Sequence, residues 1–137
     1  MKSKLNKEEK VHCLDFLFLY EQEVKQRYGH YNFDDQKLEQ FCTEKKVLKK
    51  GKRNCKEHYY FWFDTKIKAS DKGKVNDVAH HLLRHIRNSI AHGNIKKEKK
   101  ILKLYDYNSA HNQTMQAHLP IDFLWDYIDI LLNTYKQ

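Results

Sequence analysis

The feature that most constrains this chain is one long amphipathic segment, which begins at about Val75 and ends at about His92. Its apolar residues recur at steps of three and four, the spacing of one face of an α-helix. At about 100° per residue they fall within an arc of about 140°, the width of a helix face that packs against a core. They are Val75, Val78, Ala79, Leu82, Leu83, Ile86 and Ile90. Gly93 and Asn94 follow, which predicts that the helix ends there.

Two helices are expected before this segment. The first runs from Asn6 to about Tyr28, and Asn6 with Glu9 has the spacing of a capping box at its start. The second begins at about residues 34–35 and ends at Gly51. Its apolar positions are Leu38, Phe41, Val47 and Leu48. A later aromatic segment fits a third helix or a short strand, because aromatic residues suit both. Its apolar residues are Tyr59, Trp62, Phe63 and Ile67.

After Gly93 the apolar period changes from helical to strand-like. Residues 101–107 suit a short strand, residues 108–112 are turn-like, and residues 115–119 suit a second strand. Pro120 then predicts the start of a last helix. We therefore expect a mainly α fold, a bundle of about four to five helices with a small β-hairpin before the C-terminal helix. The whole chain, residues 1–137, is expected to form one domain.

The composition is that of a basic globular chain. Of the 137 residues 40% are apolar, which is enough for a core without a metal or a disulfide. The three cysteines, Cys13, Cys42 and Cys55, share no metal-binding or redox spacing and suit free thiols in a reducing compartment. The N-terminus lacks the apolar stretch of a signal peptide, so a cytoplasmic protein with no membrane partner is expected.

The formal net charge is +8, and much of the excess lies in two clusters. The first consists of Lys45, Lys46, Lys49, Lys50, Lys52, Arg53 and Lys56, and the second of Lys96, Lys97, Lys99, Lys100 and Lys103. Such clusters favour a polyanionic partner, with RNA ahead of DNA or a membrane surface. The other interpretation is a solvated surface that keeps the protein soluble.

Arg87 and His92, at the end of the amphipathic segment, are the candidate catalytic pair. Arginine is always charged and grips phosphate with two parallel hydrogen bonds. Histidine moves a proton near neutral pH. Together they suffice to cleave RNA without a metal, because His can take the 2′-hydroxyl proton and Arg can stabilise the charged phosphorane. The alternative is helix-end chemistry, in which His92 interacts with the helix dipole and Arg87 extends along the surface.

The hexamer Arg87-Asn88-Ser89-Ile90-Ala91-His92, with Gly93 after it, resembles the signature of the HEPN superfamily, an Arg and a His separated by four to six residues. In that family a polar residue, often Asn, follows the Arg, as Asn88 does here. The resemblance implies a helical bundle that usually dimerises. It also implies a metal-independent ribonuclease of a prokaryotic toxin–antitoxin, abortive-infection or antiphage defence system. Other members of the family have lost activity and only bind.

A second hexamer, Arg53-Asn54-Cys55-Lys56-Glu57-His58, has the same spacing. It follows Gly51 in a charged stretch, and no apolar stripe leads into it. The later hexamer ends an amphipathic helix and is followed by Gly93, and this difference in context separates the two. We therefore assign the catalytic role to Arg87 and His92.

The spacing of Arg87 and His92 predicts a composite site. Five residues of a regular helix turn the chain so that the two side chains point about 140° apart, with a rise of about 7.5 Å. Either the helix loosens before Gly93, or two protomers pair these helices and share one cleft. The second option agrees with the dimeric sites of the family, and a two-fold axis near this helix would bring two Arg and two His together.

The neighbouring polar residues are assigned supporting roles or none. Asn88 is expected to orient His92 or contact a phosphate, and Arg84 to widen a phosphate-binding strip, although both also suit a solvated helix surface. His81 and His85 lie four apart, as zinc ligands do. The stretch between them lacks the acidic residue of a metalloprotease helix, and no third ligand is apparent. We therefore expect no metal and no cofactor.

The leading hypothesis is a metal-independent endoribonuclease that forms a homodimer and leaves 2′,3′-cyclic phosphate products. A protein antitoxin or inhibitor would then be a partner. One alternative is a non-catalytic HEPN-like module that binds RNA, a nucleotide or a protein, and another is a helical interaction protein whose charge is incidental. HEPN toxins silenced by a nucleotidyltransferase often carry Tyr two residues after the motif His. Here that residue is Asn94, so silencing at this position is not expected.

Overall fold

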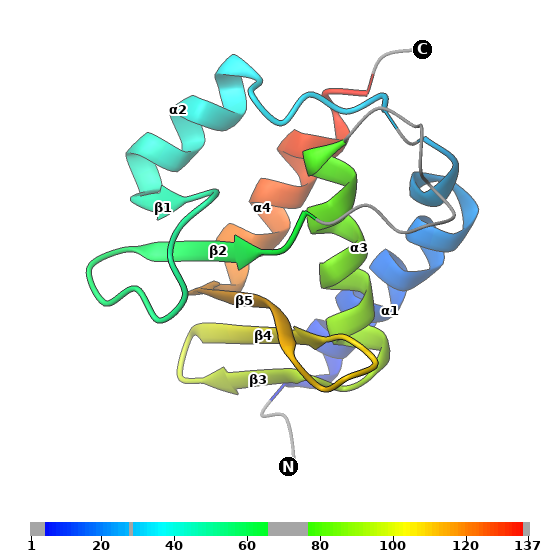
Figure 1. Ribbon diagram of the computed structural model, residues 1–137, viewed down its shortest axis with the longest axis vertical. Helices are drawn as coiled ribbons and strands as arrows, with labels where there is room; N and C mark the ends of the chain where they lie inside the picture. The colour runs from blue at the N-terminus through cyan, green and yellow to red at the C-terminus, as the bar shows by residue number, and fades with distance from the viewer. Residues whose placement is uncertain (1–4, 28, 66–76, 136–137) are drawn as a thin grey trace.

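A five-stranded sheet and four α-helices make up the described part of the chain in the computed structural model, which covers residues 5–27, 29–65 and 77–135 (Figure 1). The helices are α1 (Lys7–Gln22), the 3-10 helix η1 (Val24–Gln26), α2 (Gln36–Lys45), α3 (Val78–Ala91) and α4 (Ile121–Leu132). The strands are β1 (Val47–Leu48), β2 (Tyr59–Phe63), β3 (Ile95–Glu98), β4 (Ile101–Tyr107) and β5 (Gln113–Pro120).

The sheet corrects our prediction of a mainly α bundle with a small hairpin. Strands β4 and β5 form the expected hairpin, but it is the centre of a mixed sheet with the order β1-β2-β5-β4-β3. Strand β3 pairs antiparallel with β4, and β2 pairs antiparallel with β5. The sequence of β3 is mostly polar, so it carries no alternating apolar signal. Main-chain hydrogen bonds to β4 hold it at the edge of the sheet, where a strand needs little apolar surface.

The second helix ends earlier than predicted, and its last apolar residues form a strand. Helix α2 stops at Lys45, because Lys46 adopts a left-handed conformation with φ of 58°. Val47 and Leu48 then form β1, which pairs in parallel with Tyr59 and Tyr60 of β2. The aromatic segment is therefore a strand and not a helix. Ile67 lies outside the described residues.

The predicted starts of α1, α2 and α4 are confirmed, whereas α3 begins at Val78 and the predicted start at about Val75 lies outside the described residues. The Asn6 and Glu9 side chains form the reciprocal capping box of α1, although this helix ends at Gln22. The Asp35 carboxylate accepts hydrogen bonds from the first turn of α2, and Pro120 directly precedes α4. Within the part of the chain that the structure describes, no helix is long and apolar enough to cross a bilayer.

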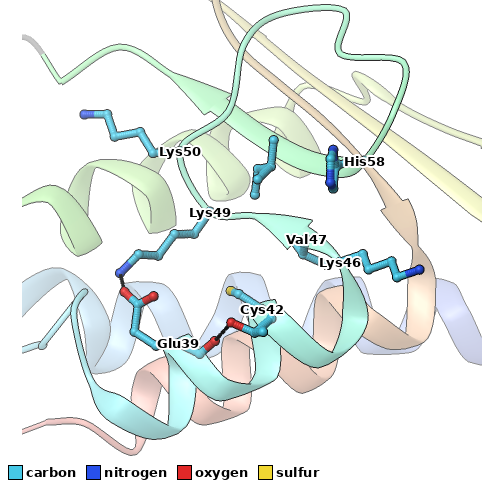
Figure 2. Close-up of a pocket in the computed structure, with 9 residues that line it drawn as sticks. Glu39, Cys42, Lys46, Val47, Lys49, Lys50 and His58 are labelled. Atoms are coloured by element: carbon cyan, nitrogen blue, oxygen red, sulfur yellow. Dashed lines mark hydrogen bonds and ion pairs between the residues drawn. The ribbon is translucent and has the colours of Figure 1, made fainter.

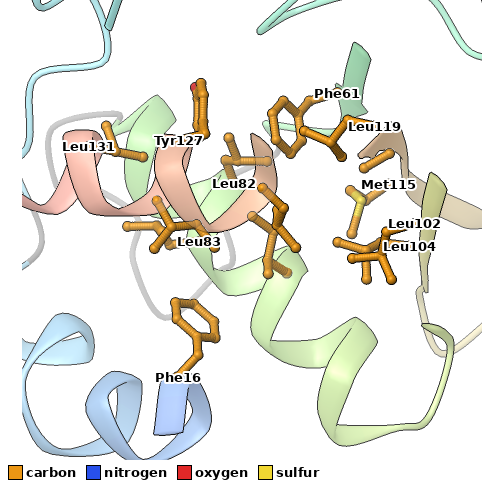
Figure 3. Packing of buried hydrophobic residues seen from close by; sticks show 14 of the residues in the cluster. Phe16, Phe61, Leu82, Leu83, Leu102, Leu104, Met115, Leu119, Tyr127 and Leu131 are labelled. Atoms are coloured by element: carbon orange, nitrogen blue, oxygen red, sulfur yellow. The ribbon is translucent and has the colours of Figure 1, made fainter. Parts of the chain in front are cut away.

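The core lies between the sheet and the helices on one of its faces (Figure 3). Phe61, Met115 and Leu104 point from the strands towards α3 and α4. They meet Leu82 and Leu83 of the α3 stripe, which are fully buried. Each such side chain contributes roughly 1.5–3 kcal/mol by leaving water. Since strand side chains alternate, the neighbouring positions of β2, β4 and β5 belong to the opposite face of the sheet.

Candidate active site at the end of α3

Helix α3 is regular as far as Ala91 and ends in a defined turn. The His92 N–H still donates to the Asn88 carbonyl, at 3.0 Å. Gly93 has φ of 73° and donates to Ile90, and Asn94 donates to Ser89 at 2.8 Å. This pair of bonds is the Schellman motif expected from a glycine after the last helical turn. The helix does not loosen before Gly93, so one protomer holds Arg87 and His92 on different sides of α3.

The Arg87 guanidinium is fixed in place at the protein surface. Its Nη1 donates to Asn88 Oδ1 at 3.0 Å, and its Nη2 donates to Glu21 Oε1 of α1 at 3.1 Å. The side chain of Arg87 is 32% exposed and that of Glu21 is 46% exposed. Arg87 is therefore held in one orientation and remains accessible to an anion.

Asn88 connects Arg87 to a buried acidic residue on the sheet. The Asn88 Nδ2 donates to Asp106 Oδ2 at 3.3 Å. Asp106 lies on β4 and is only 3% exposed. The same carboxylate oxygen lies 2.7 Å from His85 Nδ1, and His85 Nε2 lies 2.8 Å from the Asp64 carbonyl oxygen. The amide of Asn88 is thus held at both ends, by Arg87 and by Asp106.

The His85 ring has oxygen acceptors on both sides. Nδ1 faces the Asp106 carboxylate and Nε2 faces the Asp64 carbonyl, so both ring nitrogens lie against oxygen acceptors. His85 is also buried, with 5% of its surface exposed. The His85 ring and the Asp106 carboxylate form a buried hydrogen-bonded pair, and removing one partner would leave the other without its bond. This pair anchors the Asn88 amide.

Sequence reasoning missed Asp106, although the sequence contains a signal for it. Leu102, Leu104 and Asp106 occupy alternate positions of β4, and all three are buried on the helix side of the sheet. A carboxylate at an inward position of a strand requires a buried partner. That alternation points to Asp106 as part of a polar network, even before the partner is known.

Arg84 is engaged elsewhere. Its Nη2 lies 3.0 Å from His81 Nδ1, which must be the acceptor because arginine only donates. Burial and then the nearby Arg84 charge lower the pKa of His81 to about 4. Among the described residues, no side-chain hydrogen bond or ion pair joins Arg84 to Arg87 or Asn88. The structure therefore brings the Asn88 side chain to Arg87, and it does not bring the side chains of Arg84 or His92 to them.

The structure also places the His81 and His85 pair and the second hexamer. His81 and His85 bind Arg84 and Asp106 instead of facing a common point. Among the described residues, no group of three or more His, Cys, Asp or Glu side chains is placed to hold a metal ion. The second hexamer, residues 53–58, lies on the loop between β1 and β2 and not at a helix end.

The sequence matches the model of one protein family, described as HEPN pEK499 p136, over residues 10–137. No curated protein and no solved structure matches the chain. The matched range includes α3 with the Arg87–His92 hexamer, β4 with Asp106, and all five strands. The chain therefore belongs to this HEPN family.

Proposed function

We propose that this protein is a metal-independent endoribonuclease of a prokaryotic toxin–antitoxin or antiphage defence system, with a composite active site formed by Arg87 and His92 of two protomers. The observation that carries this proposal is the placement of Arg87 and His92 within the hexamer. Asn88, itself bonded to Asp106, holds the orientation of Arg87, whose side chain remains partly exposed. His92 is exposed at the C-cap of the same helix. Membership of a HEPN family supports the assignment of the hexamer.

The proposed reaction is an internal transesterification of RNA. His92 accepts the 2′-hydroxyl proton, and the 2′-oxygen attacks the adjacent phosphorus. The new bond joins the 2′-oxygen to phosphorus, and the bond from phosphorus to the 5′-oxygen breaks. The same His92 then passes this proton to the departing 5′-oxygen, and Arg87 of the other protomer stabilises the charge on the phosphorane. The products are a 2′,3′-cyclic phosphate and a 5′-hydroxyl.

The ion pair of Arg87 with Glu21 is compatible with phosphate binding. Both side chains are partly exposed, and an exposed pair contributes only about 0.2–1 kcal/mol. A phosphate oxygen therefore replaces the Glu21 carboxylate at small cost. The bond from Arg87 to Asn88 remains, so the guanidinium keeps its orientation during this exchange.

An apolar stripe on α1 supports a dimer beside this site. Val11, Leu14 and Phe18 are 45%, 63% and 66% exposed, which is unusual for such side chains in a monomer. On a regular helix the three lie within about 60° of one another, and Glu21 continues the same side. A second copy that covers the stripe would thus also reach the Arg87 and Glu21 pair. Such a contact would complete the site that one protomer leaves divided.

The proposal is tested by RNA cleavage in excess EDTA with the wild type, Arg87→Ala and His92→Ala. We expect the wild type to cleave and to leave cyclic phosphate ends, and each variant to lose about 100-fold or more of its rate. Cleavage that requires added metal, or that survives both substitutions, would contradict the mechanism.

The matched control is the double variant Arg53→Ala/His58→Ala, which removes the same residue types at the same spacing. Cleavage of a dinucleotide should be unchanged in this variant, because residues 53–58 lie on a loop away from α3. If a folded Arg53→Ala/His58→Ala variant lost dinucleotide cleavage, the chemistry would belong to residues 53–58 and our assignment to Arg87 and His92 would be wrong. RNA binding without turnover in the wild type would favour the non-catalytic HEPN-like binding module.

A further inference from the structure

The face of the sheet opposite α3 and α4 carries aromatic and basic side chains. On the helix side, Phe61 packs on Tyr127 with ring centroids 4.7 Å apart, and Phe63 lies beside His85. The alternation of strand side chains therefore sends Tyr60 and Trp62 to the other face. None of the ring contacts among the described residues joins Trp62 to a helix.

The strand register places two aromatic residues in one row across this outer face. Trp62 of β2 pairs with Gln116 of β5, and Gln116 pairs with Tyr105 of β4. Directly paired residues on one face have neighbouring side chains. Trp62 and Tyr105 are both half-buried, so part of each side chain remains accessible. They stand two strand spacings apart, roughly 10 Å.

The next row of the outer face is basic. His118 of β5 lies between Tyr60 and Lys103, and Lys103 pairs with Lys96 of β3. One carboxylate, that of Glu98, lies 3.3 Å from Lys96 and 3.4 Å from Lys103. It neutralises one of the two lysines. The row therefore keeps a positive charge beside the two aromatic rings.

The loop of residues 49–58 brings the first basic cluster onto the same face. It contains the second hexamer, and main-chain bonds hold it: Gly51 donates to Phe61 at 2.8 Å, and Asn54 donates to Gln116 Oε1 at 2.7 Å. The Arg53 guanidinium lies 5.2 Å from the centre of the Trp62 ring. Arg53 and Lys56 of the first cluster and Lys103 of the second therefore belong to the same side of the sheet.

Two hollows beside this loop are lined by basic side chains. One of about 420 Å³ lies between the loop and the sheet, and its lining includes Lys46, Lys56 and His118. The other, of about 470 Å³, lies between the loop and α2 and shares Lys46 and His58 with the first (Figure 2). Lys49 points to Glu39 there and is neutralised. Lys46 and Lys56 have no acidic partner within the described part of the chain.

We infer that this outer face is a binding surface for single-stranded RNA, with bases stacked on Trp62 and Tyr105 and phosphates bound by Arg53, Lys103 and Lys56. Aromatic rings interleaved with basic groups suit this ligand, because bases stack on the rings and the backbone follows the charges. A duplex keeps its bases inside and cannot use Trp62 or Tyr105. That the strand is RNA rests on the proposed function.

The surface lies close to the proposed active site along β4. Tyr105 faces outward, and the next residue, Asp106, faces inward and holds Asn88. The Tyr105 N–H also donates to the Asn94 carbonyl, just after His92. A strand that crosses the outer face can therefore pass the edge of the sheet near the end of α3. The inferred role is to hold the substrate strand while cleavage occurs at Arg87 and His92.

The test measures fluorescence anisotropy of a labelled 12-nucleotide 2′-O-methyl RNA, which has no 2′-hydroxyl and so reports binding without cleavage. We expect Trp62→Ala to raise Kd about 10-fold or more, since loss of one stacked base costs about 1–3 kcal/mol. Trp62→Phe should retain most of the affinity. Lys103→Glu should raise Kd and reduce its salt dependence, whereas Lys37→Glu, an equal charge change on the exposed side of α2, should not.

If the Trp62→Ala variant does not fold, a second measurement tests the same contact in a protein that keeps Trp62. Trp125→Phe leaves Trp62 as the sole tryptophan, and its fluorescence should be quenched when the RNA binds. No quenching, or unchanged Kd in folded Trp62→Ala and Lys103→Glu, would overturn the inference. Tighter binding to duplex RNA or to vesicles of anionic phospholipid would overturn it as well.

The failure of this inference is distinguishable from failure of the proposed function. If cleavage is independent of Arg87 and His92, the binding effects of Trp62→Ala and Lys103→Glu still stand. If those two variants bind the RNA like the wild type while cleavage still requires Arg87 and His92, only the inferred surface is wrong.

Discussion

Asn88 is the residue through which the interior of the protein sets the orientation of Arg87. Its amide oxygen accepts from Arg87, and its amide nitrogen donates to the buried Asp106. An amide has one accepting and one donating end, so it can join a cation to a carboxylate. A carboxylate at this position would be repelled by Asp106, and an alkyl group would bind neither. This explains why Asn suits the position that follows the motif Arg.

We expect Asn88→Ala to lower the rate of RNA cleavage by about 10- to 100-fold, because a small displacement of a catalytic group has effects of this size. RNA binding to the outer face should change little. The measurement is single-turnover cleavage together with thermal unfolding of the same sample. A variant with normal stability and normal cleavage would show that Asn88 does not position Arg87.

His81 makes stability depend on pH. Its pKa is lowered to about 4 in the folded protein by burial and by Arg84, from an ordinary value near 6.5. The unfolded chain therefore binds the proton more readily between those values. Its contribution to stability is present above about pH 6.5 and is lost as the pH falls towards 4.

We expect His81→Gln to reduce the loss of unfolding free energy between pH 7 and pH 4.5 by about 1–3 kcal/mol. Glutamine keeps an acceptor for Arg84 and does not titrate. Urea unfolding at both pH values measures the difference, with His58→Gln as the exposed control. Equal pH dependence in wild type and His81→Gln would contradict the role assigned to His81.

At the scale of elements, α3 is held at both ends by specific contacts. At its start, Asp77 accepts from the His80 N–H at 3.1 Å and from the Gly29 N–H at 2.6 Å. At its end, Gly93 and Asn94 close the Schellman turn. The Asp77 carboxylate thus caps the helix and also ties it to the segment after η1. This fixes where along the sheet the Arg87–His92 hexamer lies.

We expect Asp77→Ala to lower the free energy of unfolding by about 2–4 kcal/mol, because it removes a cap and leaves a second N–H without its acceptor. The matched control is Asp35→Ala, which removes the cap of α2 alone and should cost about 1 kcal/mol. Chemical unfolding of the two variants measures both. Equal losses would show that the bond to Gly29 contributes nothing.

The sequence was sufficient for the elements with strong local signals and insufficient for the sheet. The α1 capping box, the α3 stripe and the β4–β5 hairpin follow from local pattern. Strand β1 has two residues and β3 is mostly polar, so neither has a readable period. Both exist because β2 and β4 offer hydrogen bonds to them, and such pairing between separate segments is not visible in a local pattern.

The candidate site was predictable in its residue types but not in its connections. Arg87, Asn88 and His92 stand out by spacing and helix context. The bond from Asn88 to Asp106 joins a helix to a strand 18 positions away, and the pair of Arg87 with Glu21 joins two helices. Arg84 was a candidate for widening a phosphate-binding strip or for a solvated helix face. In the structure its guanidinium lies beside the buried His81, which provides an acceptor.

At the scale of the whole molecule, the proposed dimer surface and the proposed RNA-binding surface lie on different sides of the protein. The helices cover one face of the sheet, and the α1 stripe of Val11, Leu14 and Phe18 continues towards Arg87. The other face of the sheet carries the aromatic and basic rows. A dimer formed through α1 would leave that outer face free on both protomers, so each could hold a strand of RNA.

If the proposed dimer forms through α1, Phe18→Glu should leave the protein monomeric and abolish cleavage without unfolding it. The side chain is 66% exposed, and exposed substitutions change stability by only about 0.5 kcal/mol. Light scattering after size-exclusion chromatography gives the mass, and Gln36→Glu on α2 is the charge-matched control. A Phe18→Glu variant that remains dimeric would place the interface elsewhere.

The most direct test of the composite site is subunit complementation between Arg87→Ala and His92→Ala. The two inactive variants are mixed, allowed to exchange subunits and assayed for RNA cleavage in EDTA. If each site takes Arg87 from one protomer and His92 from the other, mixed dimers regain one intact site, and about a quarter of wild-type activity returns. A mixture that stays as inactive as either variant alone would show that both residues must act within one chain, contrary to the composite site.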